Sequence, residues 1–138
     1  MKATFKNAWG YQGNAMDLPV ENLDAAVPFY ERVMGFRSES ENETSPRATV
    51  LVRDGIRMRL AENGGDPSQD GCAFDVDDVK AAHAEIKEGL EEFNASPAGR
   101  AGSVSPELKI ETQGDGSSWK VFYIIAPDGL CYWVGEKQ

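Results

Sequence analysis

The sequence predicts an α+β protein made of two tandem βαβββ modules, with one helix per module and mainly antiparallel sheets that form a cup. The first observation behind this prediction is a repeat. The segment Leu18–Val27 recurs 56 residues later as Phe74–His83, with the same order of aliphatic, acidic and alanine positions. The second is a pair of turns, Asp54-Gly55 and Asp128-Gly129, each followed by a stretch with strand character.

Residues 1–138 are expected to form one domain, because a chain of this length can bury a substantial core. Module one covers about 10–65 and module two about 70–136. The two Asp-Gly turns are 74 residues apart, whereas the two helix starts are 56 apart, so module two carries 18 additional residues. Most of these belong to a predicted loop near 93–107, which forms either a lid over the site or a plain surface loop.

Module one is expected to begin with a strand over 13–20. A helix over 23–34 follows, with Asn22 as its N-cap and Gly35 at its end. Alternating and apolar segments then predict three strands, at 36–42, 47–53 and 56–62.

Module two repeats this order. We expect a strand at 71–76 and a helix over 78–88, which starts at Asp77 or Asp78 and stops at Gly89. The last three strands are predicted at 107–112, 118–125 and 130–135.

Each sheet has only one helix to cover it, so its other face must be buried elsewhere or line a cavity. In strand 56–62 the apolar residues Ile56, Met58 and Leu60 should pack under the helix, leaving Arg57 and Arg59 on the opposite face. The same alternation places further residues on the cavity side, namely Ala15, Asp17, Gly71, Ala73, Asp75, Cys131 and Trp133. Cys72 and Cys131 therefore point to opposite faces and cannot form a disulfide.

The net charge of −9 argues against nucleic acid or an anionic membrane as a partner, because both require a basic surface. The acidity serves solubility or a cationic ligand. No apolar stretch is long enough to span a membrane, and no secretory signal is apparent. Together with two cysteines that lack zinc-type spacing, this predicts a reducing, cytoplasmic location.

Three segments carry a resemblance to a known family: Leu18–Tyr30 with Met34-Gly35-Phe36, Cys72–Val79, and Ala126–Gly129. In their order and spacing they resemble the vicinal oxygen chelate superfamily, which includes glyoxalase I, extradiol dioxygenases, fosfomycin-resistance enzymes and bleomycin-resistance proteins. The resemblance covers nearly the whole chain apart from the predicted loop. It implies two βαβββ modules that form a cup, often completed in a homodimer.

The resemblance also implies where metal-dependent members bind their ion. Those positions fall on Ala15, Gly71 and Trp133, with Arg59 as the best match in module one. None of these side chains offers a suitable lone pair, so we expect no metal and no other cofactor. Asp17 and Asp75 alone would make a weak, Mg²⁺-like site at best. His83, the single histidine, lies on the packing face of its helix and is expected at the core or its boundary.

A cup without a metal suits reversible binding of a small molecule, either cationic or aromatic. Its candidate ligand-binding residues are Asp17, Arg57, Arg59, Trp119, Tyr123 and Trp133. For the aromatic residues the alternative is core packing, and for the arginines it is pairing with nearby acids. The leading hypothesis is a binding or sequestering protein like the bleomycin-resistance branch, with no catalytic residues. The alternatives are a lyase, isomerase or dioxygenase with an atypical site that uses Arg59 and Asp17, and a purely structural dimerisation module.

Overall fold

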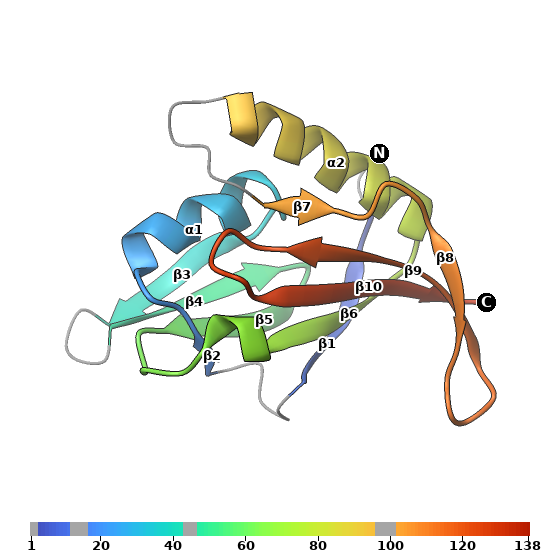
Figure 1. Cartoon of the computed structure of the whole chain (residues 1–138), viewed down its shortest axis with the longest axis horizontal. Coiled ribbons are helices and arrows are strands. Elements are labelled where there is room, and N and C mark those ends of the chain that lie inside the picture. Colours follow the sequence, from blue (N-terminus) through green and yellow to red (C-terminus); the bar gives the residue numbers. More distant parts are fainter. Residues whose placement is uncertain (1–2, 12–16, 43–46, 96–101) are drawn as a thin grey trace.

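The structure is a computed structural model that describes residues 3–11, 17–42, 47–95 and 102–138. Figure 1 shows the course of the chain, whose elements in order are β1 (Phe5–Gly10), β2 (Leu18–Pro19), α1 (Leu23–Arg32), β3 (Arg37–Asn42), β4 (Ala48–Arg53), β5 (Ile56–Ala61), the short 3₁₀ helix η1 (Pro67–Gln69), β6 (Gly71–Val76), α2 (Val79–Ala95), β7 (Ser103–Val104), β8 (Lys109–Thr112), β9 (Ser118–Ile125) and β10 (Cys131–Lys137).

The predicted fold class is confirmed, because the strand–helix–three-strand order occurs twice and each copy has the same sheet topology. One sheet has the order β2-β5-β4-β3, and the other contains β6-β10-β9 with β8 paired to β9. In both copies the first strand runs parallel to the fourth, while the remaining pairs of the copy are antiparallel. A crossover connection through the helix makes this parallel pair possible.

The two copies also share the hydrogen bonds that start their helices. In the first copy Asn22 caps α1 by accepting from the Ala25 amide, and Glu62 accepts from the Leu23 amide at 2.8 Å. The Asn22 carboxamide and the Glu62 carboxylate thus accept hydrogen bonds from backbone N–H groups that have no partner within the first helical turn. The second copy has the equivalent bonds, from Ala81 N to Asp78 Oδ1 at 3.0 Å and from Val79 N to Glu136 Oε1 at 2.9 Å.

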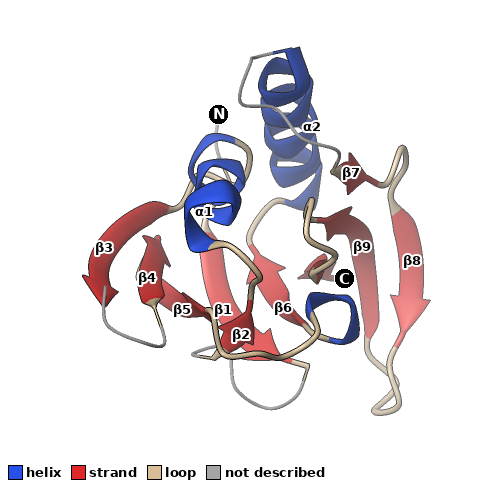
Figure 2. Ribbon diagram, turned by 60° about the vertical axis from the view of Figure 1, so that its left-hand side comes forward, coloured by secondary structure: helices blue, strands red, loops and turns tan. Residues whose placement is uncertain are grey.

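The hydrophobic core lies between the helices and the inner faces of the two sheets. In Figure 2 the sheets flank the helix pair, with β3 and β8 at opposite outer edges. The side chains predicted to face the helices are buried, among them Ile56, Met58, Leu60, Phe74 and Tyr132. The strand alternation therefore assigned the two faces correctly, and the opposite faces carry the polar and aromatic residues considered below.

Strand β1 was not predicted. It adds to the edge of β6 as an antiparallel neighbour, with Asn7 opposite Asp75 and Trp9 opposite Ala73. Phe5 is fully buried at its start, but Lys6 and Asn7 interrupt the alternation, and an irregularity in the pairing separates Phe5 from Asn7. The predicted first strand at 13–20 is confirmed only at Leu18–Pro19, since residues 12–16 lie outside the described residues.

Helix α2 is longer than predicted and runs through Gly89 to Ala95. Gly89 is not a helix stop, because it marks the point where α2 approaches the end of α1. A Cβ at this position would lie 3.1 Å from the carbonyl oxygens of both Arg32 and Val33. The glycine thus serves close helix packing. Of the predicted loop at 93–107, residues 93–95 belong to α2 and residues 103–104 form β7, while residues 96–101 lie outside the described residues.

Arg53 joins the N-terminal segment, both helices and the β4–β5 turn. Its guanidinium donates to both oxygens of Glu85 on α2 and to the carbonyl oxygens of Met34 and Ala3, and it lies 4.2 Å from the centroid of the Phe5 ring. The side chain is 6% exposed, so this buried charge is compensated by a carboxylate and by hydrogen bonds. No local pattern in the sequence distinguishes this arginine from those at the surface.

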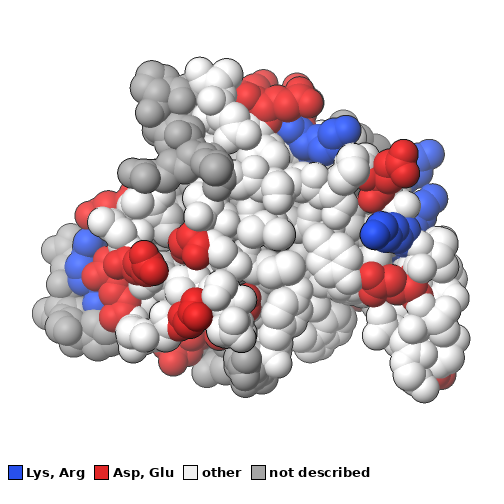
Figure 3. Space-filling model, viewed as in Figure 1, with Lys and Arg blue, Asp and Glu red and all other residues white. Residues whose placement is uncertain are grey.

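Acidic side chains are spread over the face shown in Figure 3, and basic ones form smaller patches, in keeping with the net charge of −9. Within the part of the chain that the structure describes, neither helix has the length and apolar character needed to cross a membrane.

Candidate functional site

A hollow of about 560 Å³ lies on the outer face of the second sheet, opposite the helices. We call it the aromatic cup. Its floor is the outer face of β6 and β10, and its walls come from β1, β8 and β9. The residues that line it are Trp9, Tyr11, Ala73, Glu111, Gln113, Asp115, Ser117, Trp119, Trp133 and Lys137. Its volume lies within the range of about 300–1,000 Å³ that is usual for small-molecule sites.

All three tryptophans of the chain line this cup. The rings of Trp119 and Trp133 meet edge to face, with centroids 5.4 Å apart. The Trp133 indole lies over Gly135, where any Cβ would overlap the ring. Glycine at this position therefore lets the indole lie along its own strand and present a face to the cup. The sequence predicted Trp119, Tyr123 and Trp133 as ligand-binding residues, and the structure places all three on one face of β9 and β10.

A carboxylate is fixed within this aromatic surface. Glu111 on β8 accepts a hydrogen bond from the Tyr123 hydroxyl at 2.6 Å through one oxygen and from Trp133 Nε1 at 3.1 Å through the other. Burial, followed by the hydrogen bond to Glu111, raises the pKa of Tyr123 to about 12, so the phenol remains a donor at neutral pH. Two neutral donors thus orient Glu111 without neutralising its charge. Sequence reasoning missed Glu111, because one acid among 23 carries no distinguishing signal.

The N-terminal strand supplies the second part of the aromatic surface. Trp9 is 48% exposed and Tyr11 is 46% exposed, which is unusual for large aromatic side chains and typical of binding surfaces. The Tyr11 amide donates to the Gly71 carbonyl at 3.0 Å and holds this segment against β6. These two residues were also missed, since β1 itself was not predicted.

The polar rim of the cup carries more negative than positive charge. Asp115 accepts hydrogen bonds from the Ser117 amide and hydroxyl, which lower the pKa of its carboxyl, with a smaller contribution from Lys137. With Glu111, the lining holds two carboxylates against one ammonium group. The cup therefore favours a positively charged molecule over a negatively charged one.

The positions implied for a metal do not fit one. Gly71 has no ligand atom, and a Cβ there would overlap the Cys131 carbonyl oxygen and approach the Tyr11 ring. Trp133 offers only an N–H donor, and Arg59 is a cation beside Asp17. Ala15 lies outside the described residues. Among the residues that are described, no group of three His, Cys, Asp or Glu side chains is arranged to hold a metal ion.

The thiols and the histidine offer no nucleophile and base pair. Cys72 is buried inward and Cys131 lies on the outer face, as predicted, and both are free thiols. Burial raises the pKa of the Cys131 thiol, so it remains protonated at neutral pH. His83 packs against Phe122, and its Nε2 lies 2.7 Å from the Ser105 carbonyl oxygen. Its predicted position at the core boundary is confirmed.

The other predicted site residues lie on the first sheet. Arg57 pairs with Glu39, and Arg59 Nη1 lies 3.4 Å from Asp17 Oδ1. Asp17 also accepts from Asn63 at 3.3 Å. None of Asp17, Arg57 or Arg59 lines the aromatic cup. Within one chain the structure therefore separates the six predicted residues into an aromatic set on the second sheet and an ion-paired set on the first.

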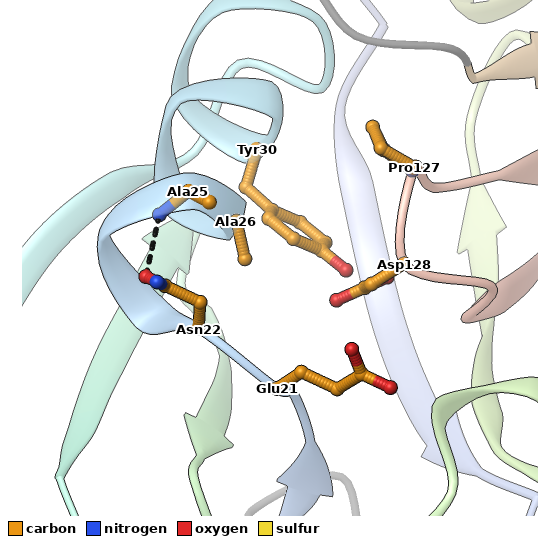
Figure 4. Close-up of a pocket in the computed structure, with 7 residues that line it drawn as sticks. All are labelled: Glu21, Asn22, Ala25, Ala26, Tyr30, Pro127 and Asp128. Carbon is orange, nitrogen blue, oxygen red and sulfur yellow. Dashed lines mark hydrogen bonds between the residues drawn. The ribbon is translucent and has the colours of Figure 1, made fainter.

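A second, smaller hollow of about 280 Å³ lies on the helix side of the molecule, between α1 and the β9–β10 turn. We call it the α1 pocket. Figure 4 shows the residues that line it: Glu21, Asn22, Ala25, Ala26, Tyr30, Pro127 and Asp128.

The sequence and the fold were compared with known proteins. A family model described as the Glyoxalase/Bleomycin resistance protein/Dioxygenase superfamily matches residues 13–103. The search of curated proteins found no match.

Among solved structures, an integron cassette protein from V. cholerae is similar with a TM-score of 0.63 and 18% identity, over 89% of this chain and 92% of that one. An antibiotic binding protein, TnmS3 from Streptomyces sp. CB03234, has a TM-score of 0.63 and 17% identity, over 89% and 93% of the two chains. Glyoxalase I from Zea mays has a TM-score of 0.57 and 15% identity over 87% of this chain, but only 44% of that protein is covered.

At these identities the structural likenesses bear on the fold alone, and all agree with the two βαβββ units described above. The family model, in contrast, spans most of the sequence. The chain belongs to the Glyoxalase/Bleomycin resistance protein/Dioxygenase superfamily.

Proposed function

We propose that the protein binds a planar small molecule with a positive charge in the aromatic cup and releases it chemically unchanged. The observation that carries this proposal is the gathering of all three tryptophans around the Glu111 carboxylate. Superfamily membership agrees with small-molecule binding, because it includes proteins that bind compounds as well as enzymes.

Planarity of the ligand is inferred from the shape of the aromatic surface. Indole rings on β1, β9 and β10, and the phenol of Tyr11 next to β1, offer flat and partly exposed faces, and stacking on such a ring contributes roughly 0.5–1.5 kcal/mol beyond burial. A bulky aliphatic ligand would use the volume of the cup without gaining these contacts.

The positive charge is inferred from the electrostatics of the cup. A cation beside Glu111 would meet an oriented carboxylate, and over the faces of Trp119 and Trp133 it would meet the negative side of their ring quadrupoles. Both effects act in the same direction. Asp115 adds a second negative charge at the rim.

Binding without chemical conversion is supported by the residues at the cup. Gly71 and Trp133 occupy positions where catalytic relatives would place metal ligands, and the Cys131 thiol has no base beside it among the described residues. The likeness to the antibiotic binding protein TnmS3 is in keeping with a sequestering role, in which a compound is held away from its target.

The cup of one chain is open on its outer side, and we further propose that a second copy of the chain covers it. Light scattering coupled to gel filtration tests this directly. A dimer is expected, and a strict monomer at the concentration used for binding would contradict it.

The binding proposal is tested by titrating two planar aromatic dyes, one with a quaternary ammonium group and one uncharged isostere, while following tryptophan fluorescence. The charged dye should bind at least about tenfold more tightly, a difference of about 1.4 kcal/mol, because a cation over an indole face gains about 0.5–2 kcal/mol and the Glu111 carboxylate adds a direct charge attraction. Glu111→Gln should reduce this preference, because it removes the oriented charge while the indole faces and Asp115 remain. Glu107→Gln, at an exposed acid outside the cup, should leave it intact.

The metal-free part of the proposal needs a separate measurement. The protein is dialysed against Mn²⁺, Fe²⁺, Zn²⁺ or Ni²⁺ and then against buffer, and its metal content is determined. We expect no stoichiometric retention of any of the four ions. Retention of one ion per chain, together with dye binding that depends on it, would overturn this part.

A further inference from the structure

The α1 pocket contains an acceptor that is not used within the protein. Asp128, on the β9–β10 turn, accepts a hydrogen bond from the Leu130 amide through Oδ1 at 3.4 Å. Its Oδ2 is buried and has no hydrogen-bond partner among the described residues. Figure 4 shows the Asp128 side chain on one side of the hollow, with the Tyr30 hydroxyl and the Glu21 carboxylate pointing toward the same space. Buried polar atoms without partners are uncommon, and each one calls for an explanation.

Because the chain is an internal repeat, the α1 pocket has an equivalent position in the other half of the molecule. The repeat relates Glu21 to Asp77 and Ala25-Ala26 to Ala81-Ala82, and the two Asp-Gly turns relate Asp128 to Asp54. The α1 pocket lies between the helix of the first copy and the turn of the second. Its counterpart therefore lies between α2 and the β4–β5 turn. Two carboxylates and two small helix residues recur in both locations.

The counterpart is filled by the chain itself. The Thr4 amide donates to Asp77 Oδ1 at 2.7 Å, and the Phe5 amide donates to Asp54 Oδ2 at 3.0 Å. In return the Asp77 amide donates to the Thr4 carbonyl oxygen at 3.1 Å. Ala3, which precedes them, is 3% exposed. The two carboxylates thus hold an extended segment of three residues by its successive main-chain N–H groups.

Among the described residues, the α1 pocket has the same acceptors but no such segment. We propose that the α1 pocket binds a short extended peptide, with two successive main-chain N–H groups donating to Glu21 and Asp128. This site is distinct from the aromatic cup, which lies on the opposite face of the second sheet. Recognition through the main chain supplies affinity with limited dependence on the peptide sequence.

The surroundings restrict the chemistry of the peptide. The floor of the pocket is Tyr30, where the counterpart has the smaller Ile86, so the peptide should carry small side chains on the buried side. Two carboxylates at the rim favour a neutral or basic peptide over an acidic one. The chain's own segment is of this kind, since Ala3-Thr4-Phe5 is followed by Lys6.

The test uses the full chain, labelled with ¹⁵N, and an N-acetylated, C-amidated peptide with the sequence Ala-Thr-Phe-Lys. We expect the amide signals of Ala25, Ala26 and Leu130 to shift on titration to millimolar peptide, while the tryptophan indole signals of the aromatic cup stay in place. The same peptide methylated at the Thr and Phe nitrogens has lost both donors. It should bind at least about tenfold more weakly, as expected for the loss of two hydrogen bonds to charged groups.

Two variants separate the pocket from general effects of substitution. Ala25→Leu fills the hollow and should weaken peptide binding at least about tenfold. Ala84→Leu is the matched control, because Ala84 is an exposed alanine on α2 that contacts no part of the pocket. Unmoved pocket signals, equal binding of the methylated peptide, or full binding by Ala25→Leu would each overturn the proposal. The failure of this site would leave dye binding in the aromatic cup unaffected, and the reverse also holds.

Discussion

The two halves of the molecule share one backbone design and differ in what they present on their outer faces. Their helices start with equivalent caps and equivalent bonds to Glu62 and Glu136. Yet the outer face of the first sheet carries arginines paired with acids, whereas that of the second carries tryptophans in edge-to-face contact beside Glu111. The fold therefore depends on helix starts and inward-facing residues. The outward residues are then available to specify a binding site in one half only.

The largest loss of stability is expected for a substitution at Arg53. This position has no equivalent charge in the second half, where the repeat places Pro127. Arg53→Ala leaves the Glu85 carboxylate and two buried carbonyl oxygens without their donor, and it should cost about 3–5 kcal/mol. The free energy of unfolding in urea measures this loss. Arg57→Ala removes an exposed ion pair and should cost less than about 1 kcal/mol. Equal losses for the two variants would contradict the internal role of Arg53.

The next largest effect is expected at Gly71. Gly71→His introduces a Cβ where β6 and β10 are in contact, and overpacking of this kind costs about 1–3 kcal/mol. The variant should also fail to gain Zn²⁺ affinity, because the space is filled by main chain and the Tyr11 ring. Gly114→Ala is a suitable control, since no atom lies within 4 Å of a Cβ at that position. A stable Gly71→His protein that binds Zn²⁺ would show that this half retains a metal site.

A smaller effect tests the cores of the two halves against each other. The hydroxyls of Tyr30 and Tyr132 are 2.7 Å apart and fully buried, whereas the repeat places the apolar Ile86 and Met58 at the equivalent positions. Tyr30→Phe strands the Tyr132 hydroxyl and should cost about 1–3 kcal/mol. The double variant with Tyr132→Phe should recover most of this loss in urea unfolding. If the double variant loses as much stability as the two single variants together, the cost does not arise from a stranded hydroxyl, and this explanation is wrong.

Asp128, on the turn of the second half, makes stability depend on pH. Burial, with a smaller contribution from Glu21, raises the pKa of Asp128 above its usual value of 3.8. Folding therefore favours the protonated form, and this carboxyl lowers stability at pH values above its folded pKa while having no effect below the unfolded one. Asp128→Asn should stabilise the protein at pH 7 and make no difference near pH 3. Thermal unfolding at both pH values checks this, and destabilisation at pH 7 would contradict it.

The sequence predicted the fold well because its signals are local. The caps at Asn22 and Asp78, the Asp-Gly turns and the alternation in strand 56–62 each act within a few residues. Asp54 and Gly55 indeed have positive φ angles of 51° and 85°, as a tight hairpin requires. Gly89 misled the prediction because its role is a contact between helices, and nothing in its own neighbourhood distinguishes that role from a helix stop.

The site was predicted only in part, because its completion is tertiary. Alternation placed Trp133 on the cavity side but left the side of Trp119 and Tyr123 undecided, because both faces of their strand are bulky, and it does not show which side chains meet them. Glu111 becomes distinctive only through its two donors, and Trp9 reaches the cup only because β1 pairs with β6. For the arginines the alternation identified the face, whereas their pairing with Glu39 and Asp17 depends on neighbouring strands and loops.

The three indole N–H groups report directly on reversible binding of a planar cation in the aromatic cup, because all three tryptophans line that cup. We would titrate the quaternary ammonium dye into ¹⁵N-labelled protein, follow the indole signals, and then recover the dye. All three signals should shift in a saturable manner, without added metal, and the dye should be recovered intact. Indole signals that stay in place at saturating dye, or a dye recovered as a reaction product, would contradict the account.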